Sequence, residues 1–366
     1  MEIKKGLENV AISNSSISSI IGTTLTYRGF KIEDLSEHAS FEEVIFLLWN
    51  DRLPTREELT TISNDLYKHA ALPSGILQLV KSFPKDANTM EMLRTGLSAL
   101  AMYDAHPTKK DPITALSIQA KIGTLVAAIG RISKGEEPLQ PLEGVGYAKN
   151  FLYMLNGVLP SDLEEEAMNK ALILHADHEF NASTFSGRVT VATLSDMYSG
   201  ITSAIGTLKG PLHGGANEQV MNMLREIGTL DRVDTYLQEA FSNKKKIMGI
   251  GHRVYKEGDP RAFILKDLSQ KLTAISGKEE LFSISVKIHE IVEKEKGLKP
   301  NVDFYSASMY DALNIPSSLF TPIFAVSRAS GWLAHIMEQY SDNRLIRPRA
   351  EYTGKTNEVY VPIDKR

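Results

Sequence analysis

Cysteine is absent from this 366-residue chain. Its absence excludes disulfides, thiolate metal sites, iron–sulfur clusters and a cysteine nucleophile. Long apolar runs are also missing, because the longest purely apolar stretches, such as residues 44–49 and 125–129, hold six residues or fewer. A membrane-spanning helix needs about 20 such residues, and the charged first ten residues lack the apolar stretch of a signal peptide. We therefore expect a soluble, cytoplasmic protein that does not bind a membrane.

A strong excess of one charge is missing as well. The 41 Lys and Arg residues stand against 45 Asp and Glu residues, which gives a formal net charge of −4. Because nucleic-acid-binding proteins carry a strongly basic balance, we expect no nucleic-acid partner. The hydrophobic fraction of 42% and the charged fraction of 23% are typical of globular proteins. At about 150 residues per domain, the length indicates about two domains.

Helical patterns run along nearly the whole sequence. Three sites have the spacing of an N-terminal capping box: Ser40 with Glu43, Thr55 with Glu58, and Ser161 with Glu164. Helical spacing of apolar or small residues predicts further helices at residues 90–103, 112–132, 163–177, 185–208, 217–227, 233–241, 261–275, 278–295, 302–313 and 317–340. The small residues of 185–208 indicate a buried helix at a helix–helix or subunit interface. Only the tail, residues 358–363, alternates like a strand, so the predicted fold class is all-α.

Histidines mark three candidate sites. His175 and His178 lie three residues apart on one helical face, where they either share a metal ion or satisfy a helix end. His213 is flanked by glycines and lies beside an expected helix start, which favours a neutral imidazole that donates a hydrogen bond to an oxyanion; a turn or capping role is the alternative. His252 lies in a second glycine-flanked loop. The lysines at 244–246 before it form either a solvated face or a phosphate contact.

One aspartate and several arginines complete the set. Asp303 follows Val302 and precedes Phe304, and such an apolar setting raises a carboxyl pKa toward the range of a general base; a helix cap is the alternative. Arg328 on an apolar helix requires an anionic partner, either a protein carboxylate or a ligand. Together these groups suit deprotonation next to a carbonyl, oxyanion stabilisation and attack on a second, multi-anionic carbonyl compound.

Five segments, in this order, resemble the motifs of the citrate synthase family in its short, Gram-positive-like form. They are GPLHGGAN, GIGHRVYK followed by DPR, NVDFYSAS, SRASGWLAHIMEQ, and RLIRPRA. The similarity extends from residues 22–30 to the C-terminus. It implies a mostly helical homodimer in which a large domain (1–215 and 313–366) carries a smaller domain (216–312) that closes over the substrate.

The resemblance also implies a role for each matching residue. Asp303 resembles the base that takes a methyl proton from acetyl-CoA, His213 the neutral group that stabilises the enol, and His252 the group that polarises the oxaloacetate carbonyl. The carboxylate ligands of oxaloacetate and citrate would be His178, Arg261, Arg328 and, from the neighbouring subunit, Arg347. The coenzyme A contacts would be Lys246, Ile247, Met248, Gly249, Ile250 and Lys256.

The implied activity is citrate synthesis from acetyl-CoA and oxaloacetate, with coenzyme A as a co-substrate, no permanently bound cofactor and no metal. A 2-methylcitrate synthase that uses propionyl-CoA is the alternative within the family. A non-catalytic protein that senses carboxylates or coenzyme A is the alternative outside enzymes. Loss of Asp303 or of a histidine would indicate such a protein, and all of them are present.

Overall fold

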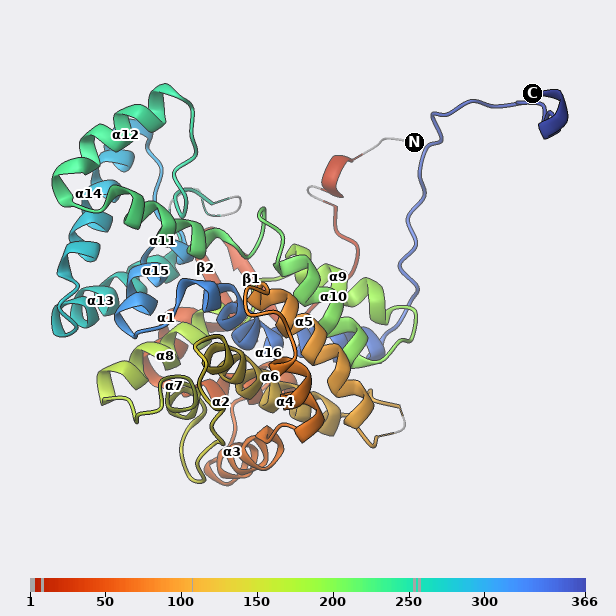
Figure 1. Ribbon diagram of the computed structural model, residues 1–366. Helices are drawn as coiled ribbons and strands as arrows, with labels where there is room; N and C mark the ends of the chain where they lie inside the picture. The colour runs from red at the N-terminus through yellow and green to blue at the C-terminus, as the bar shows by residue number, and fades with distance from the viewer. Residues whose placement is uncertain (1–3, 8–9, 107, 253–254, 256–257) are drawn as a thin grey trace.

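The computed structural model describes residues 4–7, 10–106, 108–252, 255 and 258–366. Within these residues the fold is all-α apart from one small sheet near the N-terminus, as predicted (Figure 1). The helices before residue 209 are α1 (Ile32–His38), α2 (Phe41–Asn50), α3 (Arg56–Ala70), α4 (Ser74–Lys81), α5 (Thr89–Leu100), α6 (Pro112–Ser133), α7 (Tyr147–Asn156), α8 (Asp162–His175), α9 (Ala182–Val191) and α10 (Met197–Leu208). The later helices are α11 (Ala216–Ile227), α12 (Val233–Ser242), α13 (Pro260–Ile275), α14 (Glu279–Lys296), α15 (Val302–Ala312) and α16 (Phe320–Ser341).

The sheet was not predicted from the sequence. It consists of β1 (Ser18–Ile21), β2 (Thr24–Tyr27) and β3 (Phe30–Lys31), antiparallel in the order β1-β2-β3. Its strands are only two to four residues long, too short for a clear alternation of apolar and polar side chains. The strand predicted at 358–363 was wrong, because that tail is exposed and pairs with no other segment of the described chain.

The helix predicted at 185–208 is two helices. Asp196 caps the second one by accepting the backbone N–H of Ser199, so the chain breaks between α9 and α10. The small residues nevertheless bring these two helices together, as the pattern indicated. A Cβ on Gly187 would lie 3.4 Å from the carbonyl oxygen of Gly200. The three predicted capping boxes are confirmed at the starts of α2, α3 and α8.

Helix α16 is the centre of the core. It packs against α2, α6, α8, α9 and α10, and most of its residues from Phe320 to Ile336 are buried on every side. A helix that is buried on all sides is expected to be apolar, or to have partners for its polar groups. The one arginine of α16, Arg328, is therefore an unusual residue in this position. Within the described part of the chain, α6 alone is long and apolar enough to cross a bilayer, but 83% of its most apolar window is buried in the protein.

Helices α11 to α15 gather at one end of the molecule (Figure 1). They pack mainly on one another, with α13 also touching α1 and α8, and α11 touching α16. The chain after α16 leaves the helical body as an exposed extended tail (Figure 1). Candidate site residues therefore come from the α11–α15 group, from the core helix α16 and from the tail.

Candidate active site

His178 and His252 meet although 74 positions separate them. His178 lies in the connection between α8 and α9, and the centroids of the two imidazole rings are 5.3 Å apart. The backbone N–H of Tyr255 donates to Nδ1 of His252 at 3.1 Å, so the neutral His252 ring carries its proton on Nε2. Nε2 of His178 is buried and has no hydrogen-bond partner among the described residues. Burial, with the positive charges of Arg261 and Arg328, lowers the pKa of His178 far below its usual value.

His213 lies in the turn between α10 and α11, against the N-terminus of α9. Its Nε2 accepts the backbone N–H of Ser183 at 3.3 Å and lies 2.8 Å from the Ser183 hydroxyl oxygen. An accepting Nε2 places the proton of the neutral ring on Nδ1. Burial, assisted by the charge of Arg328, lowers the pKa of His213 to about 4. The ring is therefore neutral near pH 7, and Nδ1–H is a hydrogen-bond donor.

Asp303 is the second residue of α15. The helix cap is Asn301, whose side chain accepts the backbone N–H of Asp303 at 3.0 Å, so the capping interpretation of Asp303 is wrong. Oδ1 of Asp303 is buried without a hydrogen-bond partner in the described chain. Burial raises the pKa of Asp303 to about 7, although the charges of Arg261 and Arg328 act in the opposite direction. A carboxylate with this pKa is suited to general-base catalysis at neutral pH.

Asp259 holds Arg261 through a fork of two hydrogen bonds. Nε and Nη2 of Arg261 donate to Oδ1 and Oδ2 of Asp259 at 2.9 and 2.8 Å, and both side chains are buried. Oδ2 also accepts the backbone N–H of Val302 at 3.0 Å, which ties the start of α13 to the start of α15. The protein thus supplies one carboxylate to Arg261, and on the other edge of the guanidinium Nη1 donates to the carbonyl oxygen of Leu174 at 3.5 Å.

Arg328 is the single arginine of α16, and it is buried without an ion pair. Its Nε donates to the carbonyl oxygen of His175 at 2.6 Å, and its guanidinium carbon lies 4.6 Å from the centroid of the Phe324 ring. No carboxylate of the described residues lies within 4.0 Å of it, so the interpretation of Arg328 as a salt-bridge residue is wrong. Burial lowers the pKa of Arg328 to about 10. A buried charge without an ion pair is suited to binding an anion.

The glycine-flanked loop that leads to His252 is hydrogen-bonded to the segment that leads to Asp303. The N–H of Gly251 donates to the carbonyl oxygen of Lys299 at 2.7 Å, and the N–H of Asn301 donates to that of Gly249 at 2.9 Å. This short ladder fixes the loop relative to the start of α15. These backbone hydrogen bonds thereby fix the segment before His252 relative to the segment before Asp303.

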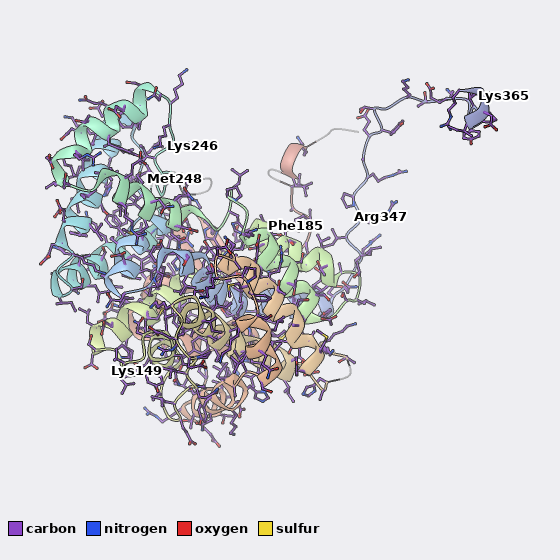
Figure 2. The ribbon with its side chains drawn as sticks, in the orientation of Figure 1. Lys149, Phe185, Lys246, Met248, Arg347 and Lys365 are labelled. Carbon is purple, nitrogen blue, oxygen red and sulfur yellow. The ribbon has the colours of Figure 1, made fainter. Side chains whose placement is uncertain are left out.

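Gly249 in this loop has a φ of +73°, and a Cβ there would lie 2.9 Å from Cα of Phe304. Only glycine allows so close an approach. Ile247, Met248 and Ile250 are half-buried, whereas Lys246 is exposed. Figure 2 shows Lys246 and Met248 on the loop beside α11 and α12. The sixth predicted coenzyme A contact, Lys256, lies outside the described residues.

Among the described candidates for catalysis and oxaloacetate binding, Arg347 is the one that its own subunit does not bring to the others. It is exposed on the extended C-terminal tail, away from the helical body (Figure 2). The other six, His178, His213, His252, Arg261, Arg328 and Asp303, converge. The rings of His178 and His252 are in contact, the charge of Arg328 affects the pKa values of His178, His213 and Asp303, and the charge of Arg261 affects those of His178 and Asp303.

His175 is hydrogen-bonded within its own helix. Its ring is fully buried, and Nδ1 donates to the carbonyl oxygen of Ala171 at 2.8 Å, one turn earlier in α8. Burial lowers the pKa of His175 to about 3. Among the residues described, no three His, Asp or Glu side chains form a group that could hold a metal ion.

Four contributors were not assigned roles from the sequence. Asp259 stood in the quoted DPR motif, where its adjacency to Arg261 was a usable signal. Tyr255, whose ring centroid is 4.6 Å from that of His252, also stood in a quoted motif, GIGHRVYK, whereas Ser183, which touches His213, had no such signal. Phe324 packs between Arg328 and the rings of His175 and His213. The contact of Ser183 with His213 joins segments 30 residues apart, and Phe324 joins its own helix to the distant His175 and His213.

Comparison with known proteins identifies the family. Residues 6–349 match the family described as citrate synthase, C-terminal domain. The chain is 56% identical to citrate synthase 2 of Bacillus subtilis strain 168, with both proteins covered completely. The chain belongs to the citrate synthase family.

Two further comparisons name the product or the ligands of relatives of this citrate synthase family member. It is 42% identical to a citrate/2-methylcitrate synthase of the same Bacillus strain, over 95% of this chain and 96% of that one. A citrate synthase of Thermoplasma acidophilum, solved as a ternary complex with carboxymethyl coenzyme A and oxaloacetate, has a TM-score of 0.94 and 35% identity, with both chains fully covered. The resemblance and the all-α fold predicted from the sequence are confirmed, and the protein is an acyltransferase.

The Asp259–Arg261 fork generates a stability prediction. We expect Asp259→Ala to lower the free energy of unfolding by about 3–5 kcal/mol, because it leaves a buried guanidinium unpaired. Urea denaturation followed by circular dichroism measures the change. The matched control is Asp267→Ala on the same helix, where an exposed carboxylate pairs with Lys271 and a much smaller loss is expected. Equal losses in the two variants would contradict the argument.

Proposed function

We propose that this chain condenses acetyl-CoA with oxaloacetate and hydrolyses the resulting citryl-CoA to citrate and CoA, the entry step of the tricarboxylic acid cycle. The observation that carries the proposal is the combination of a base and a neutral donor beside two buried arginines. Asp303 has an uncommitted oxygen and a pKa of about 7, and His213 has a pKa of about 4. The Thermoplasma relative, which binds a coenzyme A derivative and oxaloacetate, supports the same ligands here.

In the first step, the Asp303 carboxylate removes a proton from the methyl group of acetyl-CoA. Negative charge then develops on the thioester oxygen. His213 donates its Nδ1–H to that oxygen and, because its Nε2 is already engaged by Ser183, its orientation is fixed before the substrate arrives. Such preorganisation is the main source of oxyanion stabilisation.

In the second step, the enol carbon attacks the ketone carbon of oxaloacetate and forms citryl-CoA. His252 polarises the ketone by donating from Nε2, which is the protonated nitrogen because Nδ1 accepts from Tyr255. His178, Arg261 and Arg328 bind the carboxylates of oxaloacetate. Water then hydrolyses the thioester and releases citrate and CoA.

The loop Lys246–Ile250 is assigned to coenzyme A, together with Lys256. Its glycine and half-buried apolar residues offer a flat backbone surface, and Lys246 offers an exposed positive charge for a phosphate. Because the loop is bonded to the start of α15, coenzyme A bound there would present its acyl end toward Asp303.

The active enzyme is proposed to be a homodimer with shared sites. The exposed tail that carries Arg347 leaves its own subunit (Figure 2), which supports delivery of Arg347 to the partner's site. The domain division at 1–215 with 313–366 and at 216–312 follows the separate grouping of α11 to α15. The lack of cysteine and the burial of α6 support a cytoplasmic location.

Replacement of Asp303 tests the base. We expect Asp303→Asn to lower kcat by about 10²–10⁴-fold, the usual contribution of a positioned base, with a smaller effect on oxaloacetate affinity. In the wild type, kcat/KM should rise with pH until about pH 7, where Asp303 becomes ionised, and the variant should lose this rise. Asp311→Asn, on the same helix, where the carboxylate pairs with Arg225 and Lys278, is the control. Exchange of acetyl-CoA methyl protons at the wild-type rate in Asp303→Asn would contradict the assignment.

Mixed dimers test the shared site. Arg347→Ala and Asp303→Asn are each expected to be inactive alone. A hybrid dimer has one site with both native groups, so random exchange of equal amounts should restore about one quarter of wild-type activity. Subunit exchange is verified by mass spectrometry of differently tagged chains. Verified exchange without recovered activity would show that Arg347 serves its own subunit.

The preference between acetyl-CoA and propionyl-CoA tests the alternative function, 2-methylcitrate synthesis. The citrate/2-methylcitrate synthase relative is the reason to consider it. We expect acetyl-CoA to be preferred and propionyl-CoA to be turned over, because an apolar pocket distinguishes one methylene by only about 10–200-fold. Of the two aromatic residues next to Asp303, Tyr305 points its hydroxyl to His289 of α14 at 2.9 Å, which leaves Phe304 as the candidate wall. The measurement is kcat/KM for both thioesters at saturating oxaloacetate. A ratio in favour of propionyl-CoA would make the chain a 2-methylcitrate synthase.

A further inference from the structure

The connection from residue 176 to 181 carries His178 between α8 and α9 and has no regular structure. Glu179 within it has a φ of +49°, in the left-handed region that residues other than glycine rarely adopt. Its backbone groups therefore require partners from elsewhere in the molecule. Those partners determine where His178 points.

The N-terminal sheet holds one side of this connection. The Ser18 hydroxyl donates to the carboxylate of Asp177 and accepts the backbone N–H of Glu179 at 3.0 Å. The backbone N–H of Ile20 donates to the Glu179 carboxylate at 2.7 Å. The Tyr27 hydroxyl lies within 3.1 Å of both the backbone N–H and the carbonyl oxygen of Asp177. The sheet thus provides hydrogen-bond partners for the backbone and carboxylate groups of Asp177 and Glu179.

Helix α16 holds the other side through a single stripe of residues. Arg328, Gly331 and His335 are spaced by three and four positions and so lie on one face. Arg328 donates to the last carbonyl of α8. A Cβ on Gly331 would lie 2.5 Å from Oδ1 of Asp177, and Nε2 of His335 lies 3.2 Å from Oδ2 of the same carboxylate. Asp177 is fully buried between the helix and the sheet.

The second nitrogen of His335 fixes its tautomer. Nδ1 of His335 lies 3.2 Å from Nη1 of Arg188, which can only donate, so Nδ1 accepts and Nε2–H donates to Asp177. Arg188 is itself buried and paired with Glu338 at 2.6 Å. The imidazole is therefore held on both sides, as a donor to one charged group and an acceptor from another.

We propose that the Asp177–His335 pair is a positioning device for oxaloacetate, which fixes His178 relative to Arg328. The inference rests on the proposed function, because that function assigns these two residues to the oxaloacetate carboxylates. His335 and Arg328 are two turns apart on one rigid helix, and Asp177 is the immediate neighbour of His178. The hydrogen bond between His335 and Asp177 thus fixes the position of His178 relative to Arg328.

The pair also keeps Asp177 away from Arg328. Arg328 has no ion pair, and Oδ1 of Asp177 is buried without a hydrogen-bond partner in the described chain. Burial favours a raised pKa for Asp177, but His335 and Arg328 outweigh burial and hold it below its usual value, so the carboxylate is charged. Without the His335 donor, the Ser18 hydroxyl is the remaining side-chain donor described for this carboxylate, and the carboxylate can then turn toward Arg328 and compete with the substrate for the guanidinium. Binding of oxaloacetate is then weakened while the coenzyme A loop is untouched.

Two substitutions of His335 separate positioning from packing. Gln offers one donor and one acceptor, as the imidazole does, whereas Leu offers neither. We expect His335→Leu to weaken oxaloacetate binding and raise its KM by about 10–100-fold, as small displacements of binding groups do, with the KM for acetyl-CoA within about twofold. His335→Gln should recover most of the loss. Isothermal titration with oxaloacetate and steady-state kinetics on the full chain give both quantities.

Controls make the outcome specific. Ser330→Ala removes a buried hydroxyl of α16 that bonds only to its own helix, at the carbonyl oxygen of Ser327, and it should leave the oxaloacetate constants unchanged. Asp177→Ala, which removes the acceptor of the His335 hydrogen bond, serves as the second variant if His335→Leu does not fold, and it should also weaken oxaloacetate binding selectively. Oxaloacetate binding within twofold of wild type in the folded variants, or equal impairment by His335→Gln, would overturn the proposal. Failure of the wild-type chain to bind oxaloacetate would overturn the proposed function as well.

Discussion

The buried positive charges of Arg328 and Arg261 are the constraint on which the rest of the site depends. They lie among apolar side chains where a charge is costly unless it is compensated, and the protein compensates only Arg261, through Asp259. Together with burial, their field keeps His178 neutral, and Arg328 acts in the same way on His213. Burial raises the pKa of Asp303, and the same two charges limit that rise. This balance suits the proposed substrate oxaloacetate, which has two carboxylates.

Rigid elements place these groups. Helix α16 passes through the core with Arg328 on it, and the hydrogen bond from Nε to the carbonyl oxygen of His175 orients the buried guanidinium. The small sheet, one of the first elements of the chain, closes the site from the side by bonding the connection that carries His178. The loop before His252 and the start of α15 share backbone hydrogen bonds. Each candidate catalytic side chain thus rests on a segment whose backbone groups are paired, as preorganised catalysis requires.

Much of this could be predicted from the sequence because it depends on local order. Capping boxes, helical periodicity and glycine-flanked histidines are properties of a few consecutive residues, and the helices at α2, α3 and α8 begin at the predicted caps. The single helix predicted at 185–208 failed because the pattern of small residues continues through the break that Asp196 caps. The short strands failed because two to four residues do not establish a period.

The sequence by itself determined the helical class, the family and the residue types of the site, because motif spacing and composition are encoded along the chain. Only the tertiary structure decided which groups are charged and which are paired. Burial gave Asp303 a pKa of about 7, Asn301 relieved it of a capping role, and Asp259 rather than a ligand took one edge of Arg261. These outcomes arise from desolvation and from contacts between segments up to 160 residues apart, such as Asp177 with Ser18 and His335. Neither is a property of the local sequence.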